Sequence, residues 1–168
     1  MAEAIDRARR AVGASRRDGT LTAEFIALHW LAGLLILDGQ IEPGRAAALR
    51  AFELSRALGN VGLAGSIYQL ALVLAVHGET DTAARLAGFA AGYADQHQLS
   101  RYEIAIAIRG RLVERLNSAR RCSRRAVVRT RAPGHWAVML RHYLGLADRM
   151  PDRQRLKTVL SLLDSVTS

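Results

Sequence analysis

The sequence has little cysteine and no long apolar run, and each shortage excludes a class of protein. The only cysteine, Cys122, cannot form an internal disulfide, and it lacks the second cysteine or paired histidines of a zinc site. The apolar stretches 25–37 and 61–76 are shorter than the roughly 20 residues of a spanning helix. The charged N-terminus does not resemble a signal peptide. We therefore expect a cytoplasmic protein with no membrane partner, in which both stretches are buried helices.

Lysine is almost absent, and the positive charge is unevenly distributed. Of the 24 basic residues only Lys157 is a lysine, a bias that GC-rich codon usage explains in part. Residues 1–108 contain 10 basic and 11 acidic residues, whereas residues 109–168 contain 14 basic and 4 acidic residues. The net charge of +9 therefore comes from the last third of the chain and does not mark the whole protein as a nucleic-acid binder.

Strand patterns are weak, whereas helical spacing is dense. Within 61–76, four large apolar residues recur at steps of 4, 3 and 4, which places them on one face of a helix: Leu63, Ile67, Leu70 and Leu74. Gly78 then suits the left-handed position at the end of that helix. The next helix carries a stripe of small residues beside a bulkier one, namely Ala83, Ala87, Ala90 and Ala94 beside Leu86, Phe89 and Tyr93. Small side chains let two helices approach closely, so these stripes predict close helix packing.

The same layout occurs 39 residues earlier. Identical residues occupy six pairs of positions at this spacing: Leu31/Leu70, Ala32/Ala71, Leu35/Leu74, Gly39/Gly78, Ala48/Ala87 and Ala51/Ala90. Pro43 suits the first turn of the second helix in the earlier copy, and Gly59 with Asn60 suits its end. A repeat of this length favours stacked helical hairpins.

A third unit is predicted to begin near Leu99. Ser100 and Glu103 have the spacing of a capping box, and Leu99 and Ile104 that of a hydrophobic staple. After residue 117 the pattern changes, because the arginines are spread too evenly for an amphipathic helix. We therefore expect a helical domain over 1–117, a basic linker or arm over 118–134, and C-terminal helices of undefined packing over 135–168. Two alternatives for the basic segment are a solvated tail and a shifted reading frame.

No catalytic or metal-binding pattern is present. The five histidines do not form the paired spacing of a helical zinc site, and no glycine-rich loop carries the Lys-Ser or Lys-Thr of a phosphate site. Arginines around Cys122 would lower its thiol pKa, but no base or orienting partner accompanies it. The sequence therefore predicts a non-enzyme without a cofactor or a metal.

The segment GLAGSIYQLALVLAVHGETDTAARLAGFAAGYADQHQ resembles a tetratricopeptide-type (TPR) repeat. The resemblance rests on Ile67, the pair Leu70-Ala71, Leu74, Gly78, Ala83 and Ala90, and the earlier copy is similar at Leu28, the pair Leu31-Ala32, Leu35, Gly39, Gly44 and Ala51. The unit is longer than usual and lacks a proline after its second helix. The chain is also similar to the degenerate repeats at the C-terminal end of large bacterial ATPase-linked transcriptional regulators. The resemblance implies an all-α fold of antiparallel helical hairpins stacked as a short TPR-like solenoid, with a basic C-terminal extension.

The resemblance further implies a non-catalytic protein–protein interaction module, a fragment or relative of a bacterial transcriptional or signalling regulator. Such repeats present the first helix of each hairpin to a concave groove. Position by position, this places His29, Tyr68 and Leu72 on the groove, together with Arg111 and Arg115 of the third unit. The alternative is that His29 and Tyr68 are boundary residues with an apolar body and a satisfied polar tip.

A second function of a different class is binding of nucleic acid through the arginine-rich segment 109–131. The candidate phosphate contacts are Arg120, Arg121, Arg124 and Arg125. The segment lacks interleaved aromatic residues for base stacking, so the expected affinity is weak. Self-association to a homodimer is a further expectation, because terminal repeats without polar caps expose apolar surface.

Overall fold

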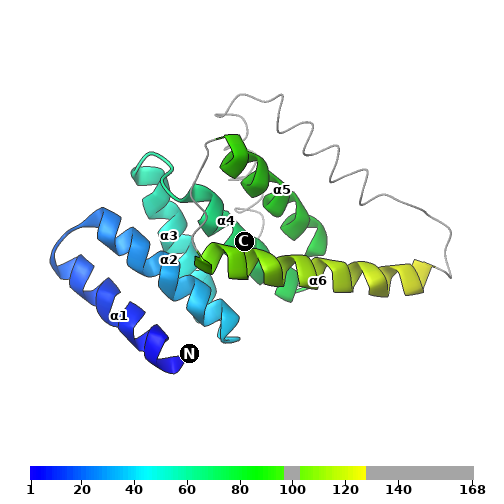
Figure 1. Ribbon diagram of the computed structural model, residues 1–168, viewed down its shortest axis with the longest axis horizontal. Coiled ribbons are helices and arrows are strands. Elements are labelled where there is room, and N and C mark those ends of the chain that lie inside the picture. Colours follow the sequence, from blue (N-terminus) through cyan, green and yellow to red (C-terminus); the bar gives the residue numbers. More distant parts are fainter. Residues whose placement is uncertain (97–102, 128–168) are drawn as a thin grey trace.

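The computed structural model describes residues 1–96 and 103–127, and the described part contains six helices and no strand. In chain order these are α1 (Ala2–Arg17), α2 (Leu21–Leu37), α3 (Ile41–Ala57), α4 (Leu63–Val76), α5 (Thr80–Gln96) and α6 (Glu103–Val127). The all-α fold class predicted from the sequence is confirmed. The first five helices are joined by short turns and run back and forth, while α6 crosses in front of them (Figure 1).

Helix α4 lies at the centre of the molecule. It contacts α2, α3, α5 and α6, and nearly every residue between Leu63 and Ala75 is buried. Helix α2 is buried on several sides by α1, α3, α4 and α6. A helix that is apolar all round is stable in water only when it is enclosed in this way. The prediction that 25–37 and 61–76 form buried helices is therefore confirmed.

The backbone turns of the two hairpins repeat at the spacing of 39 residues. Gly39 ends α2 with φ of 84° and Gly78 ends α4 with φ of 90°. The amide of Gln40 donates to the carbonyl of Leu35 at 2.9 Å, and that of Glu79 donates to the carbonyl of Leu74 at 3.0 Å. The amides of Gly39 and Gly78 likewise donate three residues back, at 3.1 and 3.3 Å. Each turn is a Schellman motif, in which a left-handed residue lets the chain satisfy the last helical carbonyls.

The small residues of the repeat occupy its tightest positions. Ala32 and Ala71 on the first helices, and Ala51 and Ala90 on the second, are each 0% exposed. Because a methyl group keeps neighbouring helix axes close, these residues set the packing distance within the pairs α2/α3 and α4/α5.

The other two helix ends also resemble each other. Gly19 follows α1 with φ of 67°, and Gly59 follows α3 with φ of 73°. The amide after each glycine donates to a buried serine carbonyl, from Thr20 to Ser15 at 3.2 Å and from Asn60 to Ser55 at 2.7 Å. The four helices α1 to α4 therefore end in one local geometry, and the predicted end at Gly59 and Asn60 is confirmed.

Helix α6 packs against both first helices of the hairpins. Its residues Ile104, Ile108 and Leu112 are at most 5% exposed, and it contacts α4 and, less extensively, α2. A Cβ atom added to Gly33 of α2 would lie 2.5 Å from Cγ1 of Ile104. The absence of a side chain at this glycine therefore lets the first turn of α6 reach α2.

A nearly buried carboxylate joins the first three helices. The Glu24 side chain on α2 is 9% exposed, and its Oε1 accepts a bond of 2.8 Å from Nε of Arg16 on α1. Nε of Arg50 on α3 lies 3.9 Å from the same oxygen. Both arginines remain about half exposed, so water reaches the guanidinium groups while the carboxylate is enclosed.

The helix that begins at Glu103 is longer than the sequence predicts. It continues through residue 117 to Val127, so the first part of the expected arm 118–134 is helical. Arginine and alanine are good helix formers, and no glycine or proline interrupts 118–127. The remainder of that arm, the capping serine Ser100 and the predicted helices within 135–168 lie outside the described residues.

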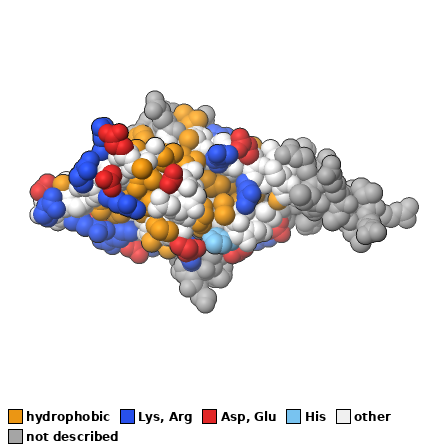
Figure 2. All heavy atoms as spheres, turned by 90° about the horizontal axis from the view of Figure 1, so that it is seen from below, with side chains coloured by type: hydrophobic (Ala, Val, Ile, Leu, Met, Phe, Trp, Pro, Cys, Tyr) orange, Lys and Arg blue, Asp and Glu red, His pale blue; other side chains and the backbone are white. Residues whose placement is uncertain are grey.

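Both signs of charge lie on the described surface shown in Figure 2, where hydrophobic side chains gather between acidic and basic ones. This mixture agrees with the near-neutral balance of residues 1–108. Within residues 1–96 and 103–127, no helix combines the length and apolar character needed to cross a bilayer.

Candidate binding groove

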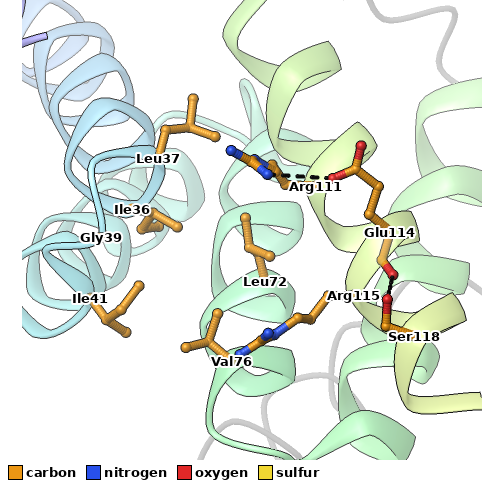
Figure 3. A pocket seen from close by; sticks show the side chains of 10 residues that line it. All are labelled: Ile36, Leu37, Gly39, Ile41, Leu72, Val76, Arg111, Glu114, Arg115 and Ser118. Atoms are coloured by element: carbon orange, nitrogen blue, oxygen red, sulfur yellow. Dashed lines mark hydrogen bonds and ion pairs between the residues drawn. The ribbon is translucent and has the colours of Figure 1, made fainter. Parts of the chain in front are cut away.

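A groove of about 350 Å³ lies where the turn between α2 and α3 meets α4 and α6. Ten residues from these four helices and the turn line it: Ile36, Leu37, Gly39, Ile41, Leu72, Val76, Arg111, Glu114, Arg115 and Ser118 (Figure 3). The repeated hairpin turn at Gly39 therefore forms one wall, and α6 forms the opposite one.

The floor of the groove is apolar. Ile36 and Ile41 flank the turn at Gly39, and Leu72 and Val76 lie one turn apart on α4. Ile36 and Leu72 are 5% and 4% exposed, so they belong to the core as much as to the groove. The floor is thus held rigidly by the same packing that holds the helices.

The rim contributed by α6 is charged. Arg111, Glu114, Arg115 and Ser118 follow one another at steps of 3, 1 and 3, which brings them to one side of a helix. Nη1 of Arg111 lies 3.5 Å from Oε2 of Glu114, and both side chains are mostly exposed. The Ser118 hydroxyl donates to the carbonyl of Glu114 at 2.9 Å.

Arg115 differs from its neighbour Arg111. Its side chain is exposed, extends over the groove toward Val76, and pairs with no acidic group of the described chain (Figure 3). A guanidinium beside an apolar floor is a fixed positive charge with unused hydrogen-bond donors. It can accept a planar anion such as a carboxylate in two parallel bonds.

A contact between a histidine and a glutamate joins two helices at one end of the groove. Nε2 of His77, which follows α4, lies 3.1 Å from Oε1 of Glu42 in the first turn of α3. These residues neighbour Val76 and Ile41 in the sequence, so the contact links α3 and α4, two of the three helices that supply the floor. Both side chains are about half exposed or more, and the pair is therefore a modest constraint.

Three of the five groove residues expected from the resemblance meet in this groove, namely Leu72, Arg111 and Arg115. The other two do not. His29 and Tyr68 are 5% and 7% exposed and lie in the interior. The expectation that both residues lie on the surface is wrong, because His29 packs against Gly65 of α4 and Tyr68 belongs to the apolar core.

His29 sits in a close-fitting site between α2 and α4. A Cβ added to Gly65 would lie 2.6 Å from Cε1 of the imidazole, and the ring of Phe25 lies 5.9 Å from it between centroids. Nε2 of Gln69 donates to the His29 carbonyl at 2.7 Å. Burial lowers the pKa of His29 from 6.5 to about 4, so the imidazole is neutral at physiological pH.

No pattern in the sequence predicts the roles of Gly33, Gly65 or Gln69. Gln69 is 0% exposed in an otherwise apolar helix, and a buried amide needs a hydrogen-bond partner. An isolated glutamine in such a stretch was the available signal for a contact between helices. The partner could not be named, since it is the backbone of His29, 40 residues earlier.

The arginines proposed to contact nucleic acid, Arg120, Arg121, Arg124 and Arg125, lie within the last turns of α6. In the part of the chain that the structure describes, no three potential metal ligands among His, Cys, Asp and Glu lie close together.

Comparisons of the chain with protein-family models, with curated proteins and with solved structures found no match.

Proposed function

We propose that this protein is a non-catalytic helical-repeat module that binds a protein or peptide partner. The observation that carries the proposal is the groove between the Gly39 turn, α4 and α6, with its apolar floor and, at its rim, Arg115, which pairs with no acidic group among the described residues. Shape and side-chain chemistry suffice for such binding, and no reacting group is required.

We further propose that the hairpins α2/α3 and α4/α5 belong to a TPR-like solenoid related to the repeats of bacterial transcriptional or signalling regulators. The repeated turns at Gly39 and Gly78 support this relationship. The contact between α2 and α6 departs from an open solenoid, because it bridges two hairpins.

Site-specific photo-crosslinking in cells of the source organism tests the module. A photoreactive amino acid replaces Ser118 at the groove, and a control replaces the exposed Ala46 on α3. We expect one protein to be crosslinked from position 118 and not from position 46, and to form a defined complex with this protein once both are purified. Equal labelling from both positions, or no purified complex, would contradict a binding groove.

Binding of nucleic acid is the second candidate, and the continuous helix through Arg120 and Arg125 favours it. Each phosphate contact would release a counterion, so affinity for random duplex DNA should fall steeply with salt. We expect the full-length variant with Arg120, Arg121, Arg124 and Arg125 changed to Gln to lose most of this salt dependence. If the wild-type chain does not bind duplex DNA even at low salt, this candidate is eliminated.

A further inference from the structure

We propose that the groove binds an acidic amphipathic peptide segment, whose apolar side chains enter between Ile41 and Val76 while an adjacent carboxylate pairs with Arg115. This inference rests on the proposed function and specifies the partner of the same groove.

The dimensions of the groove suit side chains. Its volume of about 350 Å³ falls at the lower end of the range, roughly 300–1,000 Å³, of ligand sites. The floor is formed by aliphatic side chains on α2, α3 and α4 that are fixed by core packing, so little order is lost when an apolar group enters.

The positive charge of the rim favours a negatively charged partner. Arg115 has no acidic partner in the described chain, and the 3.5 Å contact of Arg111 with Glu114 is an exposed pair of small energy. A carboxylate placed over the floor would therefore meet one unused guanidinium and a second that is weakly held. Among the lining residues, an incoming cation would meet two positive groups and the single carboxylate of Glu114.

The lining argues against nucleic acid as the occupant. None of the ten lining residues is aromatic, so no base could stack there, and the apolar floor would have to be covered by phosphate and sugar. A peptide with leucine and glutamate on one helical face satisfies both parts of the groove. Recognition of this kind places an amphipathic helix or turn in a hydrophobic groove.

Fluorescence anisotropy with the full-length protein tests the inference. The probe is a labelled helical peptide with leucines at i, i+3, i+4 and i+7 and glutamates beside them, and the matched probe has lysine in place of each glutamate. We expect the glutamate peptide to bind and the lysine peptide to bind at least about tenfold more weakly. Equal binding of the two peptides, or no binding of the glutamate peptide, would overturn the proposal.

A charge reversal locates the contact. Arg115→Glu should weaken binding of the glutamate peptide at least about tenfold and improve binding of the lysine peptide. Arg109→Glu is the control, because Arg109 is exposed on the same helix and does not line the groove. An equal loss in both variants would show that general charge, rather than this groove, attracts the peptide.

The apolar half of the site is tested by Val76→Ser, with thermal unfolding to confirm that the variant folds. The substitution should weaken binding of the glutamate peptide, and the variant should still bind this peptide more tightly than the lysine peptide.

Dodecanoate is added as a competitor in a separate experiment. If dodecanoate binds and neither peptide does, the occupant is a small amphiphilic acid and the inference is wrong. If the peptides fail while position 118 still crosslinks a protein that forms a purified complex, only the acidic-peptide inference is lost.

Discussion

Gly65 shows how one absent side chain positions a neighbour. The imidazole of His29 occupies the space that a Cβ would take, and the surrounding core leaves it little freedom to move. We expect Gly65→Ala to lower the free energy of unfolding by about 1 to 3 kcal/mol, because the ring must shift within a packed interior.

Gly110→Ala is the matched control for this substitution. Gly110 lies in the exposed part of α6, where no described atom is within 4 Å of an added Cβ. Alanine should stabilise that helix by up to about 1 kcal/mol, since it restricts the unfolded chain more than glycine does. Urea denaturation at neutral pH measures both variants. If Gly65→Ala stabilised the protein as Gly110→Ala does, Gly65 would not be a close-packing position.

His29 makes the stability of the protein depend on pH. Its pKa is about 4 when folded and 6.5 when unfolded, so the unfolded chain takes up a proton between these values and the folded chain does not. The contribution of His29 to stability is therefore complete above pH 6.5 and is lost as the pH falls toward 4. The loss is at most about 3 kcal/mol.

The comparison variant for this prediction is His29→Gln. Its free energy of unfolding should vary less between pH 6.5 and pH 4.5 than that of the wild-type protein, as measured by urea denaturation at several pH values. Carboxylates titrate in both proteins and cancel in the difference. An unchanged slope would mean that His29 is accessible to water.

Among the helices, the ion pairs of Glu24 link α1, α2 and α3 through one enclosed carboxylate. Glu24→Gln keeps the size of the side chain but removes its charge, so Arg16 and Arg50 lose their shared partner. We expect a loss of about 1 to 3 kcal/mol in the free energy of unfolding. Glu53→Gln is the control, because Glu53 contacts Arg50 at 2.9 Å but is 63% exposed. This control should change stability by less than about 1 kcal/mol, and an equal loss in both would contradict a special role of Glu24.

Helix identity and helix ends could be predicted from the sequence because their causes are local. The spacing of Leu63, Ile67, Leu70 and Leu74, and the glycines at 39 and 78, act within one or two turns of the chain. The contacts of Glu24 depend on three helices, and nothing near it in the sequence marks Arg16 or Arg50 as its partners. The even arginine spacing after residue 117 predicts an arm, whereas α6 continues to Val127, because arginine itself favours a helix.

For the molecule as a whole, α6 joins the two hairpins into one core. Ile108 is 0% exposed, whereas Val113 on the same helix is 49% exposed. Ile108→Ala should therefore cost about 2 to 5 kcal/mol, while Val113→Ala should change stability by no more than about 0.5 kcal/mol. Chemical unfolding followed by circular dichroism should show a single transition at lower denaturant for Ile108→Ala. A change confined to part of the signal would indicate that α6 unfolds independently.

The candidate groove could be predicted only in part from the sequence, because contacts across the whole molecule decide which residues line it. Leu72, Arg111 and Arg115 line the groove as the resemblance implies, although only the two arginines are exposed and Leu72 is 4% exposed. His29 and Tyr68 share that pattern, yet they are 5% and 7% exposed. The contact between α2 and α6 is not predicted by the repeat either. A repeat pattern describes neighbouring units and does not specify a contact that skips one.

The contact of Ile104 with Gly33 has a consequence for how this architecture can evolve. Tandem repeats usually grow or shrink by duplication and deletion of whole units, because each unit touches only the next. Here an extra hairpin inserted between Gly39 and Gly78 would carry α6 away from α2, and Ile104 could no longer pack against Gly33. The number of hairpins between α2 and α6 is therefore tied to the reach of one helix, and a change in copy number at this point would cost the protein this contact.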